Sequence, residues 1–203
     1  LMKHIYLVRH GQTDFNLRGI VQGSGVDASI NETGKNQAQA FYDNFRSIPF
    51  DKVYTSKLKR TQESVSRFID ITPHERFSEL NEISWGEFEG QAVSPERRAK
   101  MKSLIDGWQS GDFNLAPKDG ESPNDVAKRQ KDFVPIITER PDEKNILICS
   151  HGRAMRVFLC VLLGLPLGQM DRFAHQNLCL YQLGYNEKKG FKLLKENYIG
   201  HLH

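Results

Sequence analysis

The chain has 203 residues, of which 38% are apolar and 26% are charged. This length and composition suit one globular domain spanning residues 1–203, and no stretch approaches the about eighteen unbroken apolar residues of a membrane helix. The net charge is only +3, with 28 basic residues interleaved among 25 acidic ones, which argues against a nucleic-acid partner. No secretory signal precedes the first strand, so we expect a cytoplasmic location.

The first part of the chain alternates predicted strands with predicted helices. The run HIYLV at 4–8 predicts a buried strand that ends at Arg9. Apolar residues then recur at helical spacing from 34 to about 47. A second strand is predicted at 52–56, and the next helical face covers 58–69 before Pro73.

The second part begins with a stretch rich in glycine and proline. We expect residues 84–120 to form an insertion over the edge of the sheet, with one short helix at about 97–108. A helix bent by Pro135 follows, and then the most apolar strand, NILICS at 145–150. A helix from about 154 to 162 and two closing strands complete the pattern.

This alternation predicts an α/β fold of three layers, with a mostly parallel, doubly wound sheet between helices. In such sheets ligands bind outside the carboxyl ends of the strands. Arg9 and His10 end the first strand, Arg60 follows the second, and His151 follows NILICS. Three distant segments therefore bring cationic or ionisable side chains to one edge of the sheet.

His10 in LVRHGQTDFN is the strongest local indication of chemistry. A neutral imidazole can attack phosphorus and divide hydrolysis into two easier steps, while the guanidinium of Arg9 can hold two phosphate oxygens. A single histidine after a strand is more often structural. A second His-Gly pair, in SHGRAMR at 150–156, is harder to explain by packing alone.

With these residues the chain resembles the histidine phosphatase superfamily, the phosphoglycerate-mutase-like group, and within it the phosphatase branch. The matching motifs occur in family order: LVRHGQTDFN, TSKLKRTQES, ELNEISWGEFEG, DGESPNDVAKR and SHGRAMR. The resemblance implies that His10 is phosphorylated, that Glu82 donates a proton to the leaving oxygen, and that His151 helps to hold the phosphoryl oxygens. Because a phosphate dianion needs opposite charge, we expect His151 to be protonated when phosphate is bound. It assigns the remaining contacts with substrate to Arg9, Asn16, Gln22, Gly23, Arg60, Glu121 and Gly152.

The expected reaction is hydrolysis of a small phosphorylated metabolite without metal or cofactor. A cofactor-dependent phosphoglycerate mutase, primed by bisphosphoglycerate, stays open as an alternative, and so does a non-catalytic phosphate-binding regulator. The chain has no HExxH, no paired CxxC and no P-loop spacing. No membrane partner is indicated, and the oligomeric state cannot be read from the sequence.

Several side chains that the resemblance gives no role also carry expectations. Trp85, Phe88 and Trp108 form either an apolar lid or the packing of the insertion, and packing is favoured for Trp108. The terminal His201 and His203 are expected to lie on a frayed end. The three cysteines lie in apolar runs at wide spacings and are expected to be reduced core residues: Cys149, Cys160 and Cys179.

Overall fold

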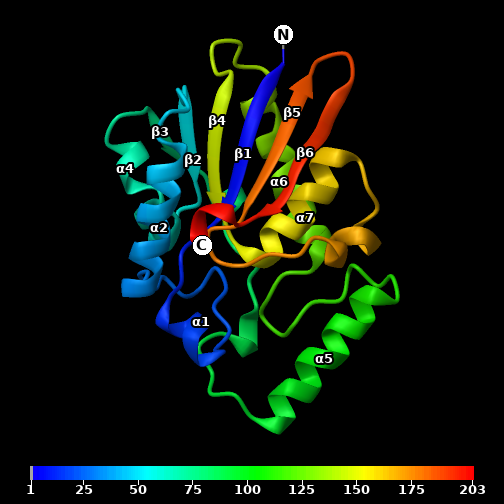
Figure 1. Ribbon diagram of the computed structural model, residues 1–203. Coiled ribbons are helices and arrows are strands. Elements are labelled where there is room, and N and C mark those ends of the chain that lie inside the picture. Colours follow the sequence, from blue (N-terminus) through cyan, green and yellow to red (C-terminus); the bar gives the residue numbers. More distant parts are fainter. Residues whose placement is uncertain (1) are drawn as a thin grey trace.

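The computed structural model describes residues 2–203 and is built around one six-stranded sheet (Figure 1). The strand order is β3-β2-β4-β1-β5-β6. The strands are β1 (Lys3–Arg9), β2 (Lys52–Thr55), β3 (His74–Arg76), β4 (Asn145–Ser150), β5 (Leu180–Asn186) and β6 (Gly190–Tyr198). Neighbours from β3 to β1 pair in parallel, whereas β5 is antiparallel to both β1 and β6. The expected mostly parallel α/β sheet is confirmed.

Helices cover both faces of this sheet. They are α1 (Asp14–Arg18), α2 (Glu32–Phe45), α3 (Lys59–Ser64), α4 (Ser66–Ile69), α5 (Pro95–Gln109), α6 (Pro123–Thr138) and α7 (Gly152–Leu163). Four short 3₁₀ turns lie at Ser78–Leu80, Gly86–Phe88, Leu167–Arg172 and Gly200–Leu202. The helix expected over 58–69 is interrupted at Val65, whose φ of −123° and ψ of 22° leave the helical region.

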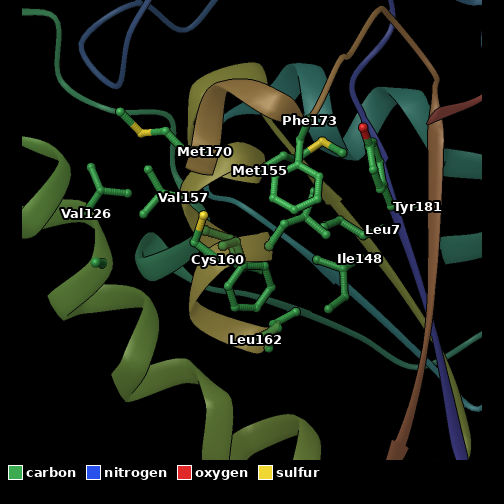
Figure 2. Close-up of a cluster of buried hydrophobic side chains, with 14 of the residues drawn as sticks. Leu7, Val126, Ile148, Met155, Val157, Cys160, Leu162, Met170, Phe173 and Tyr181 are labelled. Atoms are coloured by element: carbon green, nitrogen blue, oxygen red, sulfur yellow. The ribbon is translucent and has the colours of Figure 1, made fainter. Parts of the chain in front are cut away.

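The alternation of side chains along β1 divides the core into two layers. Ile5 and Leu7 face one cluster, while Tyr6 and Val8 face the other, beneath α2. Figure 2 shows the first cluster, in which Met155 of α7 packs among sheet residues that include Leu7. The three cysteines are buried and unpaired, as expected.

The segment 84–120, which we call the cap, lies beyond the carboxyl ends of β1, β2 and β4 (Figure 1). Trp108 of α5 is fully buried, its Nε1 donates to the Leu115 carbonyl at 2.8 Å, and its ring lies 5.5 Å from that of Trp85. Trp108 therefore packs the cap, as favoured. Whether the cap is an insertion within a single domain stays a prediction.

The prediction of a frayed carboxyl end was wrong for His201. This residue is only 5% exposed, its Nε2 lies 2.8 Å from the Leu178 carbonyl, and its ring packs against Phe41 and Phe45. The polar character of the last residues concealed this aromatic contact with α2. Over residues 2–203, no helix combines the length and the apolar character needed to cross a membrane.

Candidate active site

Three neighbouring parallel strands bring the predicted residues together at their carboxyl ends. His10 follows β1, Arg60 lies in the first turn of α3 after β2, and His151 is the N-cap of α7 after β4. The imidazole rings of His10 and His151 lie 5.2 Å apart. His151 Nε2 is also 2.8 Å from the Ser56 hydroxyl, which joins the second and third of these strand ends.

The tautomer of His10 follows from its hydrogen bond. Its Nδ1 lies 2.7 Å from the carbonyl oxygen of Gly11, so Nδ1 carries the hydrogen and Nε2 keeps a free lone pair. The ring is 2% exposed, and burial, with the adjacent Arg9 and Arg60 guanidiniums, lowers the pKa of His10 well below 6.5. His10 is therefore neutral at physiological pH, as a nucleophile must be.

The loop that carries His10 is fixed from two sides. The Gly11 N–H donates to the Ser64 hydroxyl of α3 at 2.7 Å. On the other side Gly11 touches α2, where an added Cβ would meet the Gly34 carbonyl at 2.8 Å. Further on, Thr13 and Asn16 form a reciprocal capping box that starts α1.

Arg60 and Arg9 place two guanidiniums beside His10. Arg60 is fully buried and donates to the carbonyls of Gly23, at 3.2 Å, and Val26. Burial lowers the pKa of Arg60 to about 10, which leaves it charged at neutral pH. The Nε atoms of Arg60 and Arg9 are both buried without a hydrogen-bond partner among residues 2–203. Buried donors of this kind are rarely left unpaired without a functional reason.

The protonated His151 expected to meet a bound phosphate stays a prediction, and the ring is neutral in the structure without phosphate. Burial and the Arg60 guanidinium lower the pKa of His151 well below 6.5, so the ring is neutral. Its Nδ1 is a third buried nitrogen without a partner among the described residues. The arrival of a phosphate dianion would raise the pKa of this ring, because an opposite charge nearby favours the protonated form.

The Glu82 carboxylate lies at the amino end of α7. Its Oε1 accepts from the N–H groups of Ile83, at 2.8 Å, and Ala154, at 2.9 Å, while Oε2 accepts from the Arg153 N–H at 3.1 Å. Glu82 is 7% exposed and lines the same cavity as His10. This position sets it apart from Glu79, Glu87 and Glu89, which do not line that cavity.

The cavity has a volume of about 370 Å³. The predicted residues that line it are Arg9, His10, Asn16, Gln22, Glu82 and Gly152. Gln22 donates to the Thr13 hydroxyl at 2.7 Å, and Asn16 Oδ1 accepts from Asn177 at 3.2 Å, so both side chains are held in place. Three predicted residues are not among those that line the cavity: Arg60, His151 and Gly23.

Glu121, like Arg60, His151 and Gly23, is a predicted residue that does not line the cavity, and its carboxylate contacts the start of the cap. Its carboxylate pairs with Arg129 at 2.9 Å and accepts from the Ser84 N–H at 2.9 Å, so it anchors the start of the cap. The direct contact with substrate expected for Glu121 is therefore not supported by its position.

Trp85, considered as part of an apolar lid, lines the cavity. Sequence analysis gave no role to six further residues that line it: Ile20, Val21, Met101, Ile105, Arg153 and His175. The most informative is His175, whose Nδ1 accepts from Arg9 Nη1 at 3.2 Å. Burial and three nearby arginines, Arg9 first, lower the pKa of His175 to about 3, so it stays a neutral acceptor. No motif precedes it in the loop between α7 and β5. Within residues 2–203, no group of three or more His, Cys, Asp or Glu is arranged to hold a metal ion.

Comparison with known proteins finds relatives over most of the chain. A probable phosphoglycerate mutase GpmB of Erwinia tasmaniensis is 28% identical over 191 residues, covering 92% of this chain and 86% of that protein. An adenosylcobalamin/alpha-ribazole phosphatase of Salmonella typhimurium is 27% identical over 196 residues, or 94% of each chain. The solved structure of Bacillus stearothermophilus YhfR superimposes with a TM-score of 0.87 at 24% identity, over 98% of this chain and 99% of that one, and so shares the fold.

The sequence profile of the histidine phosphatase superfamily, branch 1, matches residues 5–198. This match takes in β2, β4 and all but the first two residues of β1, together with His10, Arg60, Glu82 and His151. The chain therefore belongs to the histidine phosphatase superfamily.

Proposed function

We propose that this protein hydrolyses small phosphate monoesters through a phosphohistidine at His10. The observation that carries the proposal is the state of that ring: neutral, hydrogen-bonded through Nδ1, and flanked by two buried guanidiniums. A neutral imidazole beside fixed positive charge suits attack on a phosphate dianion, because positioning and electrostatics supply most of the catalysis of phosphoryl transfer.

In the first step His10 Nε2 forms a bond to phosphorus while the bond from phosphorus to the ester oxygen breaks. Arg9, Arg60 and His151 hold the equatorial oxygens, and their three unpaired buried nitrogens fit this role. Glu82 gives its proton to the leaving oxygen, which departs as an alcohol. Glu82 enters this step as the carboxylic acid, and its contacts with three backbone N–H groups fix its position for the transfer.

In the second step water attacks the phosphohistidine. The Glu82 carboxylate, now ionised, takes a proton from that water, the N–P bond breaks, and His10 returns to its neutral form. Asn16 and Gln22 line the cavity and are assigned to the phosphate and the ester, respectively. No step uses a metal ion, and we expect chelators to leave the rate unchanged.

A mutase is the second candidate, and the specific observation in its favour is the name of the Erwinia relative. A mutase would return the phosphoryl group from His10 to another hydroxyl group instead of to water. Incubation with phosphoglycerates, with and without bisphosphoglycerate, separates the two reactions: inorganic phosphate is the product of hydrolysis, and an isomeric phosphoglycerate is the product of the mutase.

The test of the proposed function is rapid-quench labelling with a radioactive phosphate ester. We expect label on His10 during turnover of 4-nitrophenyl phosphate, and we expect His10→Ala to lose both the label and the turnover. Brisk product release without label on His10 would contradict the mechanism. Absence of turnover of nitrophenyl phosphate at every pH from mildly acidic to mildly alkaline would favour the alternative of a non-catalytic phosphate-binding regulator.

A further inference from the structure

A second hollow of about 460 Å³ lies beside the catalytic cavity. Its walls come from the end of α1, the chain at 88–93, and the first half of α5. We call it the outer groove. Its apolar surface is formed chiefly by Val21, Phe88, Val93 and Met101. A hollow of this size matches the sites that bind small molecules.

The charge of the outer groove is of one sign. Four cationic side chains line it, Arg18, Arg97, Arg98 and Lys102, and no Asp or Glu does. Arg97 donates within the cap, and Lys102 pairs with Asp106. Arg18 and Arg98, by contrast, make no side-chain hydrogen bond or ion pair with any residue in the described range 2–203.

The outer groove continues the catalytic cavity. Val21 and Met101 line both hollows, so one pair of apolar side chains forms the border between them. On the catalytic side this border joins an apolar wall that includes Ile105 and Trp85. His10 and Glu82 line the same cavity as this wall, so an ester bound between them lies in a cavity whose apolar wall continues into the outer groove.

We propose that the outer groove binds the far end of the substrate's leaving group. This inference rests on the proposed function and names a substrate class for it: phosphate monoesters with an apolar body and a second anionic group remote from the ester. The apolar border fits the body, and the two unpaired guanidiniums fit the distal anion. A hollow that shares its border with the cavity suits part of a substrate better than the flat surface of a protein partner.

The test uses a homologous series of straight-chain ω-phosphooxy carboxylates and the matching ω-phosphooxy carboxamides. Once several methylene groups separate the two ends, the leaving alkoxide is equally basic in both, so the ratio of their kcat/KM values reports recognition of the distal charge. We expect a ratio near unity for short members and about ten-fold in favour of the carboxylate for members that reach the outer groove, since exposed ion pairs are each worth a few-fold. The ratio should also fall as ionic strength rises.

The double variant Arg18→Gln/Arg98→Gln should reduce this ratio to near unity at every chain length. The matched control is Lys100→Gln/Lys128→Gln, which removes the same charge from exposed positions outside the outer groove: Lys100 is on α5, and Lys128 is on α6. The control should keep the ratio of the unmodified protein.

Two results would overturn the inference: a ratio that stays near unity at all lengths, or a length-dependent ratio that survives in the Arg18/Arg98 variant. Both leave the proposed function intact, because the phosphate monoesters are still hydrolysed. Failure to turn over every ester, including nitrophenyl phosphate, would instead remove the proposed function and this inference with it.

Discussion

Replacement of Glu82 by glutamine isolates proton donation from the rest of the catalytic chemistry. The introduced amide can still accept through its oxygen from the N–H groups of Ile83 and Ala154, at the 2.8 and 2.9 Å contacts of the native carboxylate. It has no proton to give to the leaving oxygen. The nucleophile and the guanidiniums are untouched.

The size of the effect depends on the ester. A general acid contributes about 10²- to 10⁴-fold, or roughly 3–5 kcal/mol, so the loss should be of this order for an alkyl phosphate. For 4-nitrophenyl phosphate, whose leaving group needs little protonation, we expect a loss of less than about ten-fold.

The same substitution has a separate cost in stability. The amide group in place of Oε2 faces the Arg153 N–H, where Glu82 accepts at 3.1 Å, so two donors oppose each other. An unsatisfied buried group costs about 1–3 kcal/mol, and each kcal/mol lowers Tm by roughly 2–4 °C at this chain length. A modest fall in Tm should therefore accompany the loss of activity.

The assay compares kcat on an alkyl and an aryl phosphate for Glu82→Gln and for Glu79→Gln. Glu79 lies in the same segment but does not line the cavity, so its variant should match the unmodified protein on both esters. Equal losses on alkyl and aryl esters in Glu82→Gln would refute proton donation by Glu82 and leave only an effect on position.

Three further predictions concern histidines. Because the pKa of His10 lies well below 6.5, the acid limb of kcat/KM should lie below that pH, and a limb at or above it would contradict a buried nucleophile. His175→Ala should lower kcat/KM about ten-fold and weaken inhibition by inorganic phosphate, because Arg9 loses its hydrogen-bond acceptor. His175→Asn keeps an acceptor oxygen and should recover most of the kcat/KM and most of the phosphate inhibition. Burial lowers the pKa of His201, so the neutral ring stabilises the fold above pH 6.5, and this stabilisation is lost as the pH falls. When the pH is lowered from 6.5, the Tm of His201→Phe should therefore decrease less than the Tm of the unmodified protein.

The layered sheet could be predicted from the sequence because its central strands are strongly apolar. NILICS and HIYLV differ sharply from the charged segments around them, and both became strands close to the predicted limits. β3 was missed because His74–Arg76 has no apolar residue and becomes a strand only by pairing with β2. α1 was missed for a similar reason, since its five residues depend on the Thr13 cap.

The candidate site was predictable only where a motif marks it. His10, Arg60 and His151 follow strands, and the rule for parallel sheets places them together. Glu82 could not be chosen among its neighbouring carboxylates by spacing, because contact with the first N–H groups of α7 depends on the tertiary fold. His175 had no sequence signal at all, since its role depends on a partner 166 positions away.

The contact between Gly11 and Gly34 means that a helix without chemistry helps to determine the catalytic rate. No residue of α2 lines the cavity, yet a methyl group on Gly34 would meet the Gln12 carbonyl at 2.3 Å and displace the chain next to His10. In a mutational scan, substitutions of Gly34 should therefore lower activity as substitutions of the catalytic residues do, although Gly34 has no side chain and does not line the cavity.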